Sequence, residues 1–318
     1  MKGINQSLAS EFIIVGFYDF PHLLVPLFVS FLLIYLLILV GNLLIMVVVY
    51  SNKQLHTPMY FFLTNLAFLD ISYTTMFFPN MLSHFFLEVT HISLNGCLLQ
   101  MFFFVFMVST EFFLLAVMAY DRYVAICNPL RYITTMNDVV CMKLAAGCWL
   151  LSLIDPIPHI VLTSRLSFCG SHTIYHFFCD VAAVLNLSCS GARAVQTASY
   201  VMGTIVGVAP FALTITSYIN IISTILKIRS AEGRRKAFST CASHLTVVVL
   251  FYGVICSTYM RPPSTVSVKY NKLLSLLYVA LTPLCNPIIY CLKNTEFKNN
   301  LMKTKNIKQH SRNKKTDF

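Results

Sequence analysis

Charged residues are scarce in this chain, and their scarcity is the first fact that bounds its function. Only 11% of the 318 residues are Asp, Glu, Lys or Arg, whereas 57% are hydrophobic. A soluble domain carries about 25% charged residues, so a water-facing globule is excluded. No nucleophile, metal cluster or phosphate loop stands out, so an enzyme is not expected. No internal repeat is visible either, which argues against a transporter.

The first twenty residues also lack an apolar run of signal-peptide length. Lys2, Glu11 and Asp19 interrupt them. We therefore expect no cleavable signal, and the first long apolar stretch should act as the membrane address.

Long apolar runs dominate the rest of the chain. A helix needs about 20 mostly apolar residues to cross the hydrocarbon core. Backbone groups in lipid must bond internally, and the alternation typical of barrel strands is absent, so these runs predict helices. The fold class is an all-α membrane protein, a seven-transmembrane helix bundle. The expected spans are residues 23–50, 58–85, 97–120, 144–164, 196–226, 237–260 and 273–292.

The distribution of Lys and Arg over the connections predicts the orientation. Seventeen of the 23 basic residues lie after the first, third, fifth and seventh spans, and six lie on the other side. The positive-inside rule makes the richer side cytoplasmic. Residues 1–22 are then an extracellular N-terminus and residues 293–318 a cytoplasmic tail. The net charge of +11 thus reflects topology and contact with membrane lipids, and no nucleic-acid partner is expected.

The start of the tail predicts a short amphipathic helix on the inner leaflet. Its first turns hold Glu296, Phe297, Leu301 and Met302. The remainder is polar and basic, which favours disorder.

Four of the eleven cysteines fall on the predicted outer side: Cys97, Cys169, Cys179 and Cys189. The exterior is oxidising, so this even set predicts two disulfides, for which sequence alone allows three connectivities. The other seven are expected as free thiols. Asn5 begins a glycosylation triplet on the correct side. Asn186 begins another, which we interpret as packed between cysteines and unmodified.

Five motifs occur in order over nearly the whole chain, beside Asp121-Arg122-Tyr123 at the inner end of the third span. They are Gly41-Asn42, Leu55-His56-Thr57-Pro58-Met59-Tyr60-Phe61-Phe62-Leu63, Ser217-Tyr218, Lys236-Ala237-Phe238-Ser239-Thr240-Cys241-Ala242-Ser243-His244-Leu245 and Asn286-Pro287-Ile288-Ile289-Tyr290. Together they resemble those of the rhodopsin-like G-protein-coupled receptors, in the extended forms found in vertebrate odorant receptors. The segment that contains Ser243-His244 is typical of that narrower family.

The resemblance implies a function and two disulfide pairs. An odorant receptor binds a small, mostly hydrophobic, neutral odorant within the bundle and activates an olfactory stimulatory G protein, which raises cyclic AMP. It would lie in the plasma membrane, in the cilia of olfactory sensory neurons. Family analogy pairs Cys97 with Cys179 and Cys169 with Cys189. The alternatives are a non-olfactory chemosensory receptor of the same fold and, in another class, a transporter or channel.

The resemblance also implies an activation switch. Arg122 would pair with Asp121 at rest and meet the G protein when active, with Tyr123 completing the motif. Tyr218 and Tyr290 would bridge in the active state, and Pro287 and Pro210 provide kinks. Tyr252 stands where most rhodopsin-like receptors have tryptophan. The acidic latch low on the sixth span is missing, because residues 233–236 read Gly-Arg-Arg-Lys.

Three carboxylates fall within predicted spans, where charge is costly and usually functional. Asp70 and Glu111 could hold a sodium ion beside Asn42 and Asn286. The alternative is a protonated pair bonded to water. No other cofactor is expected.

Asp155 stands where the family usually has a neutral polar residue. It could counter a cationic ligand. We favour local partners: backbone groups freed by Pro156 and Pro158, or His159.

One helical face of the third span predicts the ligand pocket. Its residues follow i, i+1, i+4, i+5, i+8 spacing, and an apolar cavity with a few polar groups suits a small hydrophobic ligand. The alternative is ordinary helix packing. The face holds Phe104, Val105, Val108, Ser109 and Phe112, opposite Gly203, Val206 and Gly207 on the fifth span and Ile255, Cys256 and Tyr259 on the sixth.

Overall fold

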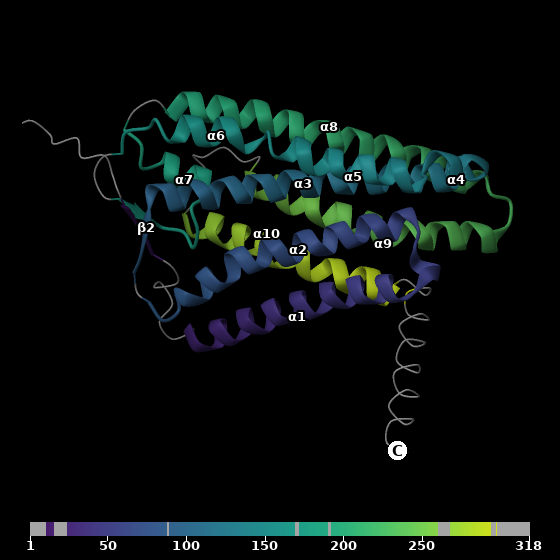
Figure 1. Ribbon diagram of the computed structural model, residues 1–318, viewed down its shortest axis with the longest axis horizontal. Coiled ribbons are helices and arrows are strands. Elements are labelled where there is room, and N and C mark those ends of the chain that lie inside the picture. The colour runs from purple at the N-terminus through teal and green to yellow at the C-terminus, as the bar shows by residue number, and fades with distance from the viewer. Residues whose placement is uncertain are drawn as a thin grey trace, which may run out of the picture.

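The computed structural model describes residues 11–15, 24–87, 89–168, 172–189, 192–259, 268–293 and 297. The long helices lie side by side along one axis (Figure 1). In this part of the chain they form seven columns: α1 (Leu24–Ser51), α2 (Pro58–Ser83), α3 (Leu94–Cys127), α5 followed by α6 (Asp138–Ser152 and Pro156–Thr163), α8 (Ala192–Lys227), α9 (Ala231–Tyr259) and α10 (Val268–Lys293). Shorter elements fill connections: η2 (Lys53–Leu55), η3 (Pro129–Arg131), α4 (Tyr132–Thr135) and α7 (Val181–Leu185).

Each predicted span overlaps one column. Five columns are long and apolar enough to cross a membrane: α1, α2, α3, α5 with α6, and α8. The helix α9 is bent by 41° and makes a sixth if its two parts count together. In α10 the apolar part is shorter, at Ser275–Tyr290. The third column runs on past the predicted end at residue 120 to Cys127, so the Asp-Arg-Tyr motif is helical.

The outward faces of the columns are apolar. On α1 the side chains of Leu33, Leu37 and Val40 are each more than half exposed. Soluble monomers rarely show apolar surface this extensive. It is the surface expected of a helix that meets lipid on one side and the bundle on the other.

The ends of the columns follow from local sequence. Ser93 caps α3 by accepting a hydrogen bond from the Gly96 amide at 3.1 Å. Asn137 caps α5 by accepting one from the Val140 amide at 3.0 Å. The fourth column breaks before Pro156, because proline supplies no amide hydrogen and clashes with the preceding turn.

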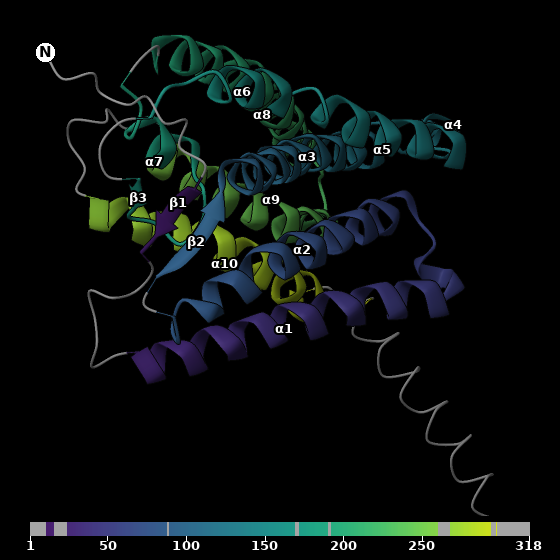
Figure 2. The ribbon, with the colours of Figure 1, turned by 60° about the vertical axis from the view of Figure 1, so that its left-hand side comes forward.

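A small sheet covers one end of the bundle, so the all-α prediction was incomplete. Strand β1 (Glu11–Ile14) lies between β2 (Thr90–Ser93), antiparallel, and β3 (Thr173–Ile174), parallel, and Figure 2 shows the three strands together beside α7. Phe12 and Ile14 of β1 are buried in a cluster with Cys97 of α3 and Cys179 of the nearby loop. Part of the predicted N-terminal segment therefore belongs to the folded body.

The columns α1 and α10 approach closely at one glycine. A Cβ atom on Gly41 would lie 2.8 Å from the Cβ of Pro287, so a larger residue would push the helices apart. The glycine of the first motif and the proline of the last one therefore meet where the two helices pack. Of the predicted tail helix, only Phe297 lies within the described residues, where it is helical and fully buried in the main core.

Candidate functional site

A disulfide joins the long loop to the start of α3. Cys97 and Cys179 are bonded, with their Cα atoms 5.3 Å apart, and the Cys179 amide donates to the Gln100 side chain at 2.9 Å. Both cysteines are buried beneath the sheet. This predicted pair is confirmed.

The other predicted modifications are only partly within the described residues. Cys189 is disulfide-bonded, whereas Cys169 and Asn5 lie outside the described residues, so their pairing and glycosylation stay predictions. Asn186 ends α7 and is exposed. Burial, which was the reason for expecting it unmodified, therefore does not hold.

Aromatic rings fill the outer part of the predicted pocket face. The ring of Phe104 stacks on Phe178 of the long loop at 5.1 Å and meets Phe77 and Tyr73 of α2. About two helical turns further along α3, Phe112 packs on Phe251 at 4.8 Å and on Tyr252 at 5.3 Å. The sequence assigned no role to Phe178, a buried residue of the long loop whose ring covers this face.

The structure brings six of the predicted lining residues into one core cluster and leaves two others exposed. Phe104, Phe112, Val206 and Ile255 are buried members of this cluster, and Val105 and Val108 pack against it. Gly203 and Cys256 are exposed instead. A side chain at Gly207 would meet no atom within 4 Å. The side chain of Tyr259 lies outside the described residues.

Ser109 and Asp155 form a buried polar pair inside this apolar region. The Ser109 hydroxyl lies within hydrogen-bond distance of an Asp155 carboxylate oxygen and of the Val105 carbonyl oxygen. Only 1% of Ser109 and 6% of Asp155 are exposed. The second oxygen of Asp155 is buried and has no hydrogen-bond partner among the described residues.

This contact corrects the expectation for Asp155. Its side chain caps no backbone amide of α6 and reaches across to α3 instead. His159 bonds to the main-chain oxygen of Asp155 at 3.0 Å, and not to its carboxylate. With Thr163, these two residues make a buried polar row at i, i+4, i+8 on α6. Asp155 and His159 were singled out from the sequence, but the rotation of α6 that turns them inward could not be predicted from it.

A second buried polar group lies around Asp70 in mid-bundle. The Asn286 amide donates to Asp70 at 2.9 Å, which joins α2 to α10 beside Pro287. Asn42 donates to the carbonyl oxygens of Ile38 and Pro283. Glu111 is buried on α3. No group of three acidic, histidine or cysteine side chains suited to a metal occurs within the described ranges.

The inner end of α3 holds an ion pair. Two Arg122 nitrogens, Nε and Nη2, donate to the same Asp121 carboxylate oxygen, the Nε at 2.8 Å. Asp121 is fully buried. The Tyr132 hydroxyl donates to the other Asp121 oxygen at 2.8 Å. Burial, followed by the charge of Asp121, raises the pKa of Tyr132, so the hydroxyl stays protonated and keeps donating. The sequence assigned no role to Tyr132.

A polar contact also joins α8 to α9. The Tyr218 hydroxyl and His244 Nδ1 are 2.6 Å apart, and the rings are stacked. Both side chains are buried. The Tyr290 hydroxyl is buried as well and has no partner in the described part of the chain. Tyr123 is half-buried and packs against the core beside Tyr218.

Comparison with known proteins identifies the family. The family model described as olfactory receptor matches residues 31–308. Human olfactory receptor 1L4 is 49% identical over 94% of this chain and 96% of its own length. Human olfactory receptor 6Y1 is 47% identical over 94% and 92%, respectively, and mouse olfactory receptor 5G29 is 43% identical over 94% and 95%. The chain therefore belongs to the olfactory receptor family: with its apolar helices it is a multi-pass membrane receptor for odorants, and not an enzyme or a transporter.

Proposed function

We propose that this receptor binds a small odorant in the half of the bundle nearest the sheet and activates an olfactory stimulatory G protein at the other end, which raises cyclic AMP. Two independent observations support the orientation this requires. Seventeen of 23 basic residues lie on the connections opposite the sheet. The Cys97–Cys179 disulfide lies at the sheet end, and disulfides persist in oxidising surroundings.

We expect the receptor in the plasma membrane with its N-terminus outside, and in the cilia of olfactory neurons. Asn5 is then accessible for glycosylation. Glycosidase treatment should increase the gel mobility of the receptor but not of Asn5→Gln, and an unchanged shift in the variant would contradict this assignment. Peptide mapping without reduction should recover Cys169 joined to Cys189.

The Ser109–Asp155 pair carries the proposal for ligand chemistry. It is the polar contact on the apolar face that runs from Phe104 to Phe112, and one carboxylate oxygen is left without a partner. A buried acceptor without a donor costs about 1–3 kcal/mol. A ligand with an apolar body and one hydroxyl group would supply the donor and remove that cost. Neutral alcohols therefore fit better than the aldehydes, ketones and esters that the apolar lining alone also allows.

A matched ligand series tests this chemistry. An alcohol, its alkane analogue and its amine analogue should be compared on the wild type, Ser109→Val and Asp155→Asn in a cyclic-AMP reporter assay. We expect the alcohol to be the best agonist and Asp155→Asn to raise its half-maximal concentration about tenfold, the equivalent of ~1.4 kcal/mol. Responses only to amines, lost in Asp155→Asn, would show a cationic ligand instead.

The polar contacts at the inner end support the switch. The Arg122–Asp121 pair lies within α3, the Tyr132 hydroxyl joins Asp121 to α4, and the Tyr218–His244 contact joins α8 to α9. Because the acidic latch on α9 is missing, the neutral Tyr218–His244 contact takes its place. Activation would break it and release Tyr218 toward Arg122 and Tyr290, with Pro287 and Pro210 as kinks and Tyr252 beneath the ligand.

The coupling test compares two arginines. Arg122→Ala should abolish the cyclic-AMP response while surface expression remains measurable, because Arg122 is proposed to meet the G protein. Arg131→Ala in η3, which removes an exposed arginine nearby, should respond normally. Normal signalling by Arg122→Ala would refute the switch.

We also propose that Asp70, with Glu111, Asn42 and Asn286, holds a sodium ion in the resting state. The chemistry of the set suits a hard cation, since the carboxylate and amide oxygens are its usual ligands. Raising sodium at constant ionic strength with potassium should reduce basal signalling in the wild type. An identical reduction in Asp70→Asn would contradict the site.

A further inference from the structure

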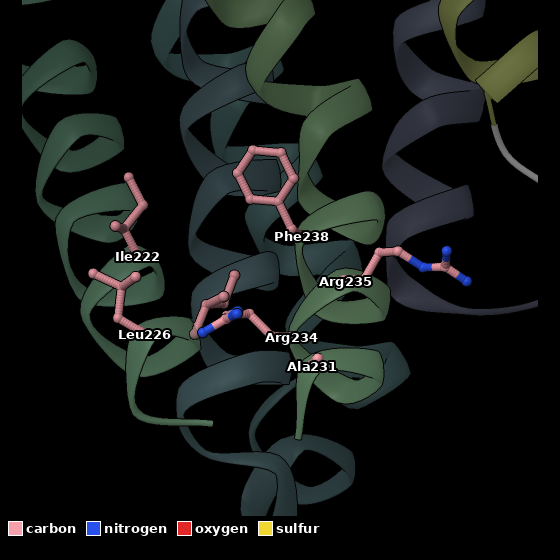
Figure 3. A pocket seen from close by; sticks show the side chains of 7 residues that line it. Ile222, Leu226, Ala231, Arg234, Arg235 and Phe238 are labelled. Atoms are coloured by element: carbon pink, nitrogen blue, oxygen red, sulfur yellow. The ribbon is translucent and has the colours of Figure 1, made fainter. Parts of the chain in front are cut away.

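A groove opens between α8 and α9 next to the turn that joins them. It encloses about 430 Å³ and is lined by Ile222, Ile225, Leu226, Ala231, Arg234, Arg235 and Phe238. In Figure 3, Arg234 reaches across toward Leu226, and Arg235 extends to the opposite side. Ile222, Leu226 and Phe238 are each more than 40% exposed, so the groove faces outward from the bundle.

The lining is ordered by polarity along the helix axes. The two arginines lie within about one turn of the α8–α9 connection, whereas Phe238 and Ile222 lie about one turn deeper, at 1.5 Å per residue. The close view shows the same order, with the phenyl ring further from the connection than the Arg234 guanidinium. This is the order of a membrane lipid, with the charged headgroup at the interface and the acyl chains inside.

The charges are uncompensated. Within the described residues, neither guanidinium forms a salt bridge with a carboxylate. A guanidinium presents a planar fork of donors that matches phosphate oxygens. Long basic side chains at a helix end also extend readily to the headgroup region.

We propose that this groove binds one anionic phospholipid of the inner leaflet, with the phosphate on Arg234 and an acyl chain along Ile222, Leu226 and Phe238. The assignment rests on the proposed orientation, which places the α8–α9 connection in the cytoplasm. The lipid assignment does not depend on which odorant the receptor binds. A lipid here would bridge the inner ends of the two helices that Tyr218 and His244 join deeper in the bundle.

Photo-crosslinking in nanodiscs tests the proposal on the full-length receptor. The probes are phosphatidylserine and phosphatidylcholine, each with a diazirine on one acyl chain, and labelled peptides are identified by mass spectrometry. Phosphatidylserine should label the groove peptides of α8 and α9 several times more than phosphatidylcholine. Arg234→Gln should reduce that labelling about fivefold, the factor that corresponds to ~1 kcal/mol per basic residue near an anionic surface.

Two matched controls separate the groove from general basicity and from misfolding. Arg229→Gln removes an exposed arginine in the connection that does not line the groove, and labelling should persist. Leu226→Trp fills the groove and should lower labelling by the acyl chain, whereas Leu213→Trp, on an exposed part of α8, should not.

The possible contrary results are distinct. Equal labelling by both probes, or equal losses in Arg229→Gln and Arg234→Gln, would overturn the proposal. Because labelling needs neither odorant nor G protein, a receptor that signals normally with an unlabelled groove would refute the lipid site alone. A labelled groove in a receptor that does not couple would refute the switch alone.

Discussion

The two ends of the bundle are held by different kinds of interaction. At the sheet end, a disulfide, three paired strands and a stack of aromatic rings connect segments far apart in the chain. At the other end, a few polar contacts join α3 to η3–α4 and α8 to α9: the Arg122–Asp121–Tyr132 group and the Tyr218–His244 contact. The contacts at the sheet end are covalent or involve many residues, whereas the polar contacts at the other end can break one at a time.

This difference matches the division of labour in a receptor. A binding site must keep its shape to discriminate ligands, since reorganisation consumes binding energy. A switch needs two arrangements that differ by only a few kcal/mol. We infer that the sheet end is the fixed part and that the inner ends of α8 and α9 are the moving part.

The largest effect should come from breaking the disulfide. Cys97→Ser releases a loop of 82 residues, worth roughly 4–5 kcal/mol in the chain-entropy relation. We expect near-complete loss of receptor at the cell surface by flow cytometry. Cys148→Ser, at a buried free thiol, should retain most of it. Comparable losses in the two variants would mean that the disulfide has no special role.

A smaller effect is expected from the strand that the sequence did not predict. Phe12→Ala empties a fully buried position at the centre of the sheet cluster, which should cost about 3 kcal/mol. A thermal-shift assay on purified receptor should show a lower transition temperature, with odorant affinity reduced. Leu33→Ala on the exposed face of α1 is the control and should change little.

The smallest effect on stability should come from the inner end, together with a gain of signalling. His244→Phe removes the hydrogen bond to Tyr218, worth about 1 kcal/mol, and leaves the Tyr218 hydroxyl available for the active arrangement. Basal cyclic AMP should rise about fivefold where the receptor is mostly at rest. Tyr200→Phe on the exposed part of α8 should leave it unchanged. A fall in basal signalling in His244→Phe would show that the contact serves the active state.

Sequence predicted the columns well because apolar length is a local property. The span of residues 58–85 starts where α2 starts, at Pro58, since proline at a first helical position is itself a signal. The disulfide Cys97–Cys179 followed from family resemblance and not from spacing. The strand Glu11–Ile14 was missed, because its partners are distant in the chain and four residues carry little periodicity.

The candidate site was predicted less completely, for a different reason. Periodicity placed Phe104 and Phe112 correctly on a buried face of α3. It could not fix the rotation of α8 and α9, so Gly203 and Cys256 were assigned inward and are exposed. The partner of Asp155 depends on how α6 restarts after Pro156, and this rotation is set by tertiary packing. The Tyr218–His244 contact likewise depends on how α8 packs against α9, which periodicity cannot predict.

The most direct test of the account compares movement at the two ends in one receptor. Spin labels on Arg131→Cys and Glu232→Cys report the distance between the inner ends of α3 and α9. Labels on His91→Cys and Tyr175→Cys report the sheet end. All four positions are exposed, and the exposed Cys256 is replaced by serine in both pairs.

Pulsed electron-electron double resonance should then be recorded with and without a saturating agonist and G protein. We predict that the inner pair moves apart by several ångströms and that the outer pair keeps its distance. An inner pair that stays fixed while the outer pair moves would contradict the division into a fixed outer end and a moving inner end.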